Sequence, residues 1–79
     1  MEPSPEAQAL LAILAKTVGA EIDWLIDAKS YDRDRLQQLI EQLALLGLIE
    51  VQGPPNPEAT LGCDVERVEI TALGYISAA

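Results

Sequence analysis

The segment from Arg33 to Glu50, RDRLQQLIEQLALLGLIE, constrains the fold more than any other part of the chain. Its apolar side chains recur at the spacing of a helix that buries one face: Leu36, Leu39, Ile40 and Leu43. Gly47 follows as a C-terminal helix stop, and residues 48–51 favour a short apolar strand. The segment therefore predicts a helix from Arg33 to about Leu46 that turns directly into a strand.

Two further helices are predicted upstream of this segment. Residues 1–5 are expected to be a frayed lead-in that ends in a helix start, with Ser4 as the N-cap and Pro5 at the first helical position. The apolar positions of the first helix are Leu10, Ile13, Leu14 and Thr17/Val18, with Gly19 as its end. The second helix is expected from Glu21 to Lys29, with its inner face formed by Ile22, Leu25 and Ile26. Asp32 is then a plausible N-cap for the third helix.

The chain after Glu50 predicts a hairpin and a short last helix. Residues 53–57, GPPNP, are a loop, because Gly and Pro interrupt any regular structure. Residues 65–70 alternate in the manner of a strand, with Val68 and Ile70 facing inward. Thr71 is expected to cap a final helical stretch at residues 72–77, in which Gly74 allows tight packing.

Composition excludes several classes of function. The chain has 79 residues, enough for one domain covering residues 1–79, with no His and a single cysteine, Cys63. A zinc site of the four-Cys or Cys–His kind, an internal disulfide and a His-based catalytic pair are therefore excluded. Acid pairs such as Asp23/Asp27 are interpreted as solvated helix-surface charge, and no Gly-rich phosphate loop is present. We predict a protein that is not an enzyme, with no cofactor, no metal and no evident small-molecule substrate.

The sequence also bears on location. No apolar run reaches the roughly 18 residues that a membrane-spanning helix needs. The N-terminal stretch MEPSPEAQ is acidic and contains two prolines, which does not fit a signal peptide. We therefore expect a cytoplasmic protein without a membrane partner.

Three motifs follow one another in the order typical of one family of domains. EIDWLIDAKSYDRDRL occupies Glu21–Leu36, the pattern L-x-x-x-G-L-I-x occupies Leu43–Glu50, and x-L-T-x-x-G is matched by Glu69–Gly74 with Ile at the Leu position. Over about residues 6–78 the chain thus resembles the winged helix-turn-helix domains of bacterial and archaeal transcription regulators, such as the MarR-like and PadR-like groups. The resemblance implies an α+β, mainly helical fold: a single winged helix-turn-helix domain with three helices, a two-stranded wing at residues 50–70 and a short C-terminal helix. It also implies that the helix at residues 33–46 reads DNA.

The DNA-reading interpretation depends on the start of that helix. The side chains there that suit phosphates or base edges are Lys29, Arg33, Arg35, Gln37 and Gln38. Against them, Asp32 and Asp34 lie between the bases, residues 50–70 hold five acids and one base, and the formal net charge is −8. Because phosphate contacts dominate affinity, we expect one copy to bind duplex weakly. A dimeric DNA-binding transcription regulator is therefore the alternative interpretation.

Apolar residues away from the expected core favour a protein partner. Trp24 and Leu45 lie opposite the inner stripes of their helices, and Leu11 marks a second narrow apolar face on the first helix. Since Trp is enriched at the centres of interfaces, we interpret the chain as a protein-binding or regulatory module, or a homodimer, with weak or lost DNA binding. Three readings stay open: another part of the chain covers Trp24, Leu45 is a lone surface leucine, or the acidic surface mimics a nucleic acid.

Overall fold

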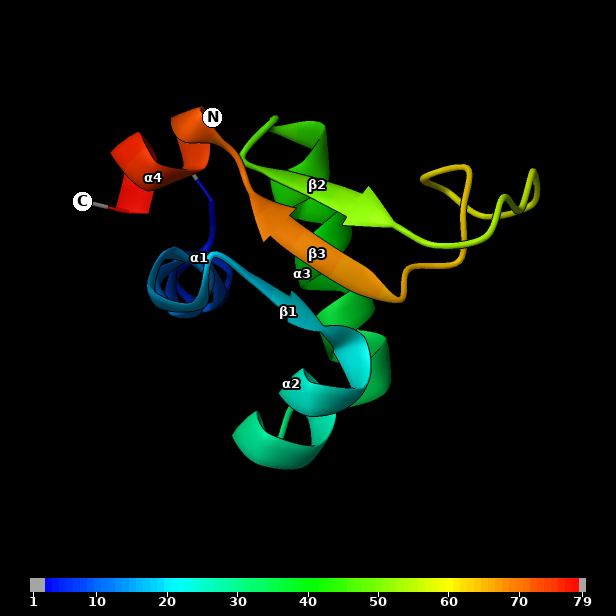
Figure 1. Ribbon diagram of the computed structural model, residues 1–79, viewed down its shortest axis with the longest axis horizontal. Coiled ribbons are helices and arrows are strands. Elements are labelled where there is room, and N and C mark those ends of the chain that lie inside the picture. The colour runs from blue at the N-terminus through cyan, green and yellow to red at the C-terminus, as the bar shows by residue number, and fades with distance from the viewer. Residues whose placement is uncertain (1–2, 79) are drawn as a thin grey trace.

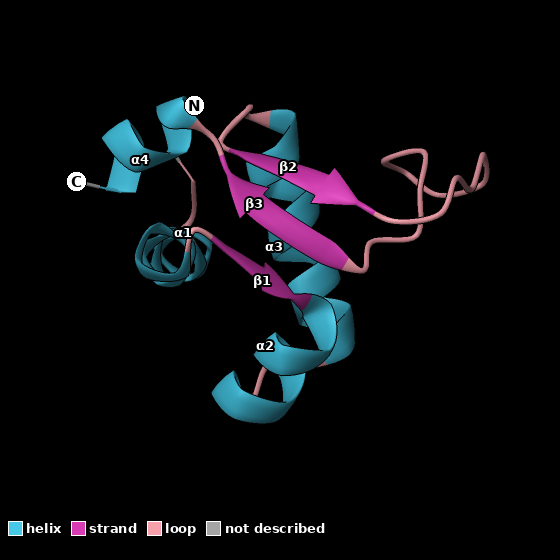
Figure 2. Cartoon of the chain, viewed as in Figure 1, coloured by secondary structure: helices cyan, strands magenta, loops and turns pink. Residues whose placement is uncertain are grey.

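The computed structural model describes residues 3–78, in which four helices surround the strands of one small sheet (Figure 1). In chain order the elements are α1 (Pro5–Thr17), β1 (Gly19–Glu21), α2 (Ile22–Lys29), α3 (Arg33–Leu45), β2 (Ile49–Gln52), β3 (Arg67–Ile70) and α4 (Ala72–Ala78). Helices hold most of the residues in regular structure (Figure 2). The expected α+β, mainly helical class is therefore confirmed.

The sheet is antiparallel, with β3 between β1 and β2. Within residues 3–78 it has three strands: β2 and β3 form the predicted hairpin, and one further strand was not expected. The additional strand, β1, pairs with β3 and places Ala20 opposite Val68. Gly19 is required for this approach, because a Cβ at that position would lie 2.9 Å from the carbonyl oxygen of Val68. The chain thus links α1 to α2 by a strand where only a helix end was expected.

The core lies between the sheet and the helices that cover it. In Figure 1, α3 runs behind the sheet, and α1 is seen nearly end-on between β1 and α4. The largest fully buried side chains come from α1, α2, α3 and β3: Leu10, Leu11, Leu14, Leu25, Leu36, Leu39, Ile40, Leu43 and Val68. No charged or polar residue is buried among those that the structure describes. Aliphatic burial, at about 1.5–3 kcal/mol for each large side chain, is therefore the main stabilising term.

Side-chain caps mark the ends of the elements where the sequence predicted them. The hydroxyl of Ser4 accepts from the backbone N–H of Ala7 at 3.2 Å at the start of α1. The carboxylate of Asp32 accepts from the backbone N–H of Arg35 at 3.1 Å at the start of α3. Each cap satisfies an amide that the first helical turn leaves without an intrahelical partner.

Thr71 joins the end of the sheet to α4 and to the turn after α3. Its hydroxyl accepts from the backbone N–H of Gly74 at 3.1 Å and donates to the carbonyl of Gly47 at 2.8 Å. Gly47 has φ +75°, the left-handed conformation that favours glycine at a helix end. A Cβ at Gly74 would collide with the carbonyl oxygen of Leu48, so this glycine allows α4 to pack against the start of β2. The predicted roles of Gly47, Thr71 and Gly74 are therefore confirmed.

The structure corrects the predicted buried stripe of α1 and part of the predicted frayed lead-in. Its buried stripe consists of Ala7, Leu10, Leu11 and Leu14, and Thr17 and Val18 are exposed. The reason is that α1 ends at Thr17, after which Val18 takes φ +68° and turns the chain into β1. Of the expected frayed lead-in, residues 1–2 lie outside the described residues. Ser4 is held, because its backbone N–H donates to Oε1 of Gln42 at 2.8 Å.

None of the helices within residues 3–78 has the length and apolar character needed to cross a membrane.

Candidate interaction surface

The connection between α2 and α3 is short and tight. α2 ends at Lys29, Ser30 adopts the left-handed conformation with φ +59°, and α3 begins at Arg33 after its cap Asp32. The backbone N–H groups of Ser30 and Tyr31 both donate to the carbonyl of Leu25, which closes the end of α2. Two helices joined in this way are compatible with a helix-turn-helix topology.

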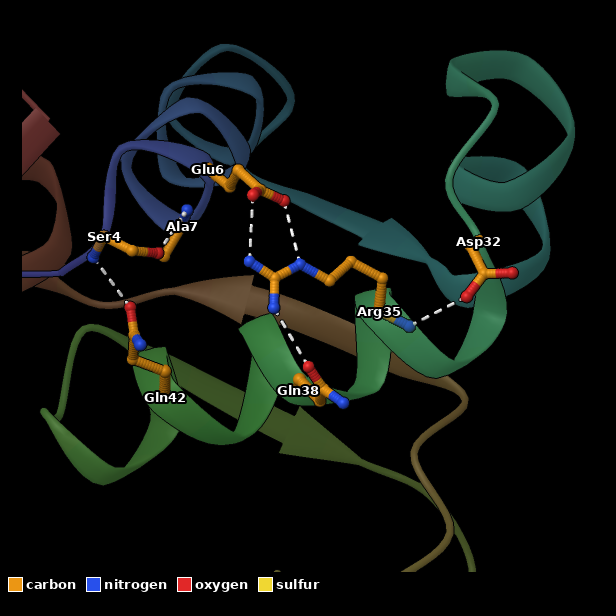
Figure 3. A network of polar contacts seen from close by, with 7 residues as sticks. All are labelled: Ser4, Glu6, Ala7, Asp32, Arg35, Gln38 and Gln42. Atoms are coloured by element: carbon orange, nitrogen blue, oxygen red, sulfur yellow. Dashed lines mark hydrogen bonds and ion pairs between the residues drawn. The ribbon is translucent and has the colours of Figure 1, made fainter.

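Arg35, in the first turn of α3, points toward α1 (Figure 3). Its Nε and Nη2 each donate to a carboxylate oxygen of Glu6 at 2.9 Å, and Nη1 donates to Oε1 of Gln38 at 2.9 Å. These hydrogen bonds, and then the charge of Arg35, lower the pKa of Glu6 below its ordinary value, and Glu6 raises the pKa of Arg35 in the same way. All three nitrogens of the guanidinium are therefore engaged within the molecule.

The contacts of Arg35 continue along α3 as a polar seam against α1. Arg35, Gln38 and Gln42 are spaced three and four residues apart, so they share one side of α3. Arg35 contacts Glu6, and Oε1 of Gln42 accepts from the backbone N–H of Ser4 (Figure 3). We call the five residues of this contact the α1–α3 seam: Ser4, Glu6, Arg35, Gln38 and Gln42. Two of the residues proposed for base reading, Arg35 and Gln38, thus belong to a contact between helices.

The remaining bases near α3 and in β3 also have partners in the molecule. Arg33 Nη2 lies 3.7 Å from Oδ1 of Asp23, with both side chains largely exposed, so this pair is weak. Nζ of Lys29 lies 5.5 Å from the ring centroid of Trp24, within the range of a cation–π contact. In β3, Arg67 Nε lies 3.4 Å from a carboxylate oxygen of Glu69. The potential of each base is thus partly offset by its neighbour.

The side of α3 away from the core carries acids. Four residues spaced by three or four positions form this outer face of α3: Asp34, Gln37, Glu41 and Leu45. Asp34, Gln37 and Leu45 are exposed and Glu41 is half-buried. The outer face of α3 therefore presents two carboxylates, one amide and one apolar side chain.

The loop between β2 and β3 is ordered by its own polar contacts. Nδ2 of Asn56 donates to Oδ1 of Asp64 at 2.8 Å, and Oδ1 of Asn56 accepts from the backbone N–H of Glu58 at 3.0 Å. Pro55 and Cys63 form an isolated bridge across the loop. Glu58 and Asp64 stay exposed, so the loop adds negative charge to the surface.

The structure separates the three apolar residues singled out for a protein partner. Leu45 is 76% exposed and Trp24 is 40% exposed, so both side chains reach the surface. Leu11 has no exposed area. The expectation of a second apolar face around Leu11 is therefore wrong, because the residue lies in the buried stripe of α1 with Leu10 and Leu14.

A hollow of about 600 Å³ lies where α2, the start of α3 and the β2–β3 hairpin meet, and charged residues dominate its lining. Its acids are Glu21, Asp23 and Glu66, and its bases are Arg33 and Arg67. Because the acids outnumber the bases, this hollow does not concentrate positive charge beside α3.

Sequence reasoning missed the exposed apolar side chains of α4. Ile76 is 73% exposed, Leu73 is 51% exposed and Tyr75 is 40% exposed. Leu73 also lines a second hollow, of about 610 Å³, together with Leu46 and Leu48. The signal was present in the sequence, because residues 70–79 contain no charged residue. Gly74 is the residue of α4 that faces the core. Because the helix is short, its larger apolar side chains therefore face solvent.

Comparison with protein-family models, with curated proteins and with solved structures found no match. Within residues 3–78, no three His, Cys, Asp or Glu side chains gather in a way that could hold a metal ion.

The candidate interaction surface consists of the outer face of α3, the Trp24 side of α2 and the apolar side of α4.

Proposed function

We propose that the protein is a non-catalytic winged helix-turn-helix module that binds another protein and whose DNA binding is weak or lost. The observation that carries this proposal is the charge of the outer face of α3, where Asp34 and Glu41 take positions that would face a nucleic acid. A helix presented to a phosphate backbone needs bases on that side, because phosphate contacts supply most of the affinity. Carboxylates at these positions repel the backbone.

The engagement of the bases supports the same proposal. Arg35 is held by both carboxylate oxygens of Glu6, so contact with a phosphate would require this bidentate pair to open. Arg67, the base of the wing, lies beside Glu69. A domain with a net charge of −8 and few free cations is steered away from duplex DNA at low ionic strength.

The exposed apolar residues supply the contact that a protein partner needs. Leu45 continues the outer face of α3, and Trp24 lies on the surface of the neighbouring helix α2. Trp is among the residues that contribute most at the centres of interfaces. The ammonium of Lys29 lies 5.5 Å from the centroid of the Trp24 ring, so a cation borders this side chain. Each of the two side chains can therefore serve a partner as an apolar anchor.

The test is quantitative capture of binding proteins from the native lysate by the wild type and by surface variants. Trp24→Ala and Leu45→Glu are expected to lose a protein that the wild type retains. Ala12→Glu is the matched control, because it adds the same charge at an exposed position elsewhere, on α1. If no captured protein depends on Trp24 or Leu45, the proposal of a protein-binding surface here is wrong.

A second candidate function, a DNA-binding transcription regulator, is favoured by the helix-turn-helix-compatible connection of α2 and α3 and by the exposed bases Lys29 and Arg33. Its test is a gel shift with genomic fragments near 50 mM salt, where weak phosphate binding is strongest. A shift that Arg33→Gln reduces would support this function. Absence of a shift at this low salt would rule out DNA binding as the function.

A further inference from the structure

The apolar side of α4 borders a hollow whose lining residues are all uncharged. Residues 42–49, from the end of α3 into β2, contain no charged residue, and neither do residues 70–79. Every charged residue of the chain lies outside these two segments. They meet in space, because the hydroxyl of Thr71 donates to the carbonyl of Gly47 and the side chain of Leu73 lies near Gly47.

A hollow of about 610 Å³ opens between these segments and the start of α1. Its apolar lining comes from Pro3, Pro5, Leu46, Leu48 and Leu73. Its polar lining residues are the uncharged Gln8 and Ser77, which bond to each other: Nε2 of Gln8 donates to the carbonyl of Ser77 at 2.8 Å. This bond ties α4 to the start of α1 at the edge of the hollow.

Ile76 stands beside this hollow on the same helix as Leu73. The two residues are three positions apart, so they are neighbours on α4, and Ile76 is 73% exposed. One molecule thus carries a protruding apolar side chain next to an apolar recess. In a contact with two-fold symmetry, such a pair is self-complementary, since each copy offers the side chain that the other receives.

We infer that the apolar side of α4 is a self-association surface, on which Ile76 of one copy enters the hollow beside Leu73 of a second copy. The net charge of the chain indicates which molecule covers this surface. Two copies that each carry −8 repel one another wherever their acids would meet, so they associate only through a face without charges. A cationic partner gains nothing from this uncharged face and would choose the acidic outer face of α3.

A stable interface commonly buries about 800 Å² on each partner, roughly a sixth of the 4790 Å² that this chain exposes, so the contact has to extend from the hollow over the apolar side of α4. The contact leaves the outer face of α3 free, because the lining of the hollow includes none of Asp34, Gln37, Glu41 and Leu45. Self-association is therefore independent of the protein binding proposed above.

The test is sedimentation equilibrium of the full chain from about 1 µM to 1 mM, the range of weak to moderate affinities. The wild type is expected to form dimers in this range. Ile76→Glu and Ile76→Lys are each expected to weaken dimerisation at least about 30-fold, the loss typical of a central interface residue. Using both charges separates the loss of the apolar contact from simple repulsion. Circular dichroism checks that the variants fold, as expected for an exposed position.

Leu45→Glu is the matched control, because Leu45 is exposed to nearly the same extent, 76%, and the substitution adds the same charge. It is expected to dimerise like the wild type. Raising the salt concentration is expected to strengthen dimerisation, since it screens the repulsion between two acidic copies. A wild type that stays monomeric throughout this range overturns the inference, as does a dimer that Leu45→Glu weakens as much as Ile76→Glu. A monomeric wild type would leave the proposed binding of another protein by Trp24 and Leu45 untouched.

Discussion

Substitution of Leu11 by Ala distinguishes a core residue from a surface anchor. The side chain has no exposed area and is packed in the stripe that α1 turns to the core. Removing such a side chain leaves a cavity and commonly costs about 2–5 kcal/mol of the free energy of unfolding. A chain of this length has a total stability of roughly 4–12 kcal/mol, so Leu11→Ala is expected to remove a large part of it.

The magnitude can be measured as a melting temperature. A loss of about 3 kcal/mol lowers the Tm of a domain of this size by roughly 12–24 °C. The assay is thermal and urea unfolding followed by circular dichroism, with every variant at the same protein concentration because self-association contributes to stability. The same truncation at the exposed Leu45 is the matched control and is expected to change the free energy by less than about 0.5 kcal/mol.

The comparison of these two leucines has a clear refuting result. If Leu11→Ala destabilises the chain no more than Leu45→Ala, then Leu11 does not lie in the core and the packing of α1 described above is wrong. Leu11 would then again be a candidate for the contact surface.

The remaining stability predictions concern the α1–α3 seam and the docking of α4. Because Arg35 lowers the folded-state pKa of Glu6 below 4.5, their ion pair stabilises the fold above that pH and is lost as the pH falls through the lowered pKa. The Tm difference between wild type and Glu6→Gln is therefore expected to be largest above pH 4.5 and to vanish in stronger acid; a pH-independent difference would contradict this. Gly74→Ala places a Cβ against the carbonyl of Leu48 and is expected to cost about 1–3 kcal/mol in urea unfolding, whereas no cost would mean that α4 packs less closely.

Local signals predicted the helix boundaries well. Ser4 and Asp32 cap helices through neighbouring amides, and Gly47 stops α3 through its own left-handed backbone, so each signal acts within a few residues. The apolar stripe of α3 was equally clear, because polar residues separate its leucines and isoleucine on every turn. In α1, by contrast, alanines and aliphatic residues surround the stripe, and its centre could not be located from periodicity alone.

The features that sequence reasoning missed depend on residues far apart in the chain. β1 has three residues and owes its existence to pairing with β3, nearly fifty positions later. Arg35 was considered for DNA contact because its partner, Glu6, lies 29 positions away on another helix. The exposed side of α4 was missed because only the packing of Gly74 decides which of its apolar residues face solvent.

The most direct test of the proposed loss of DNA binding is a fluorescence anisotropy titration of a random-sequence duplex at about 50 mM salt. Domains that bind DNA without sequence preference have Kd values of about 1–100 µM even at physiological salt, and they bind more tightly at lower salt. Because the outer face of α3 carries the carboxylates of Asp34 and Glu41, we expect no saturable binding up to about 100 µM protein. Saturable binding within this range, with a Kd that rises steeply with added salt, would contradict the proposed loss of DNA binding.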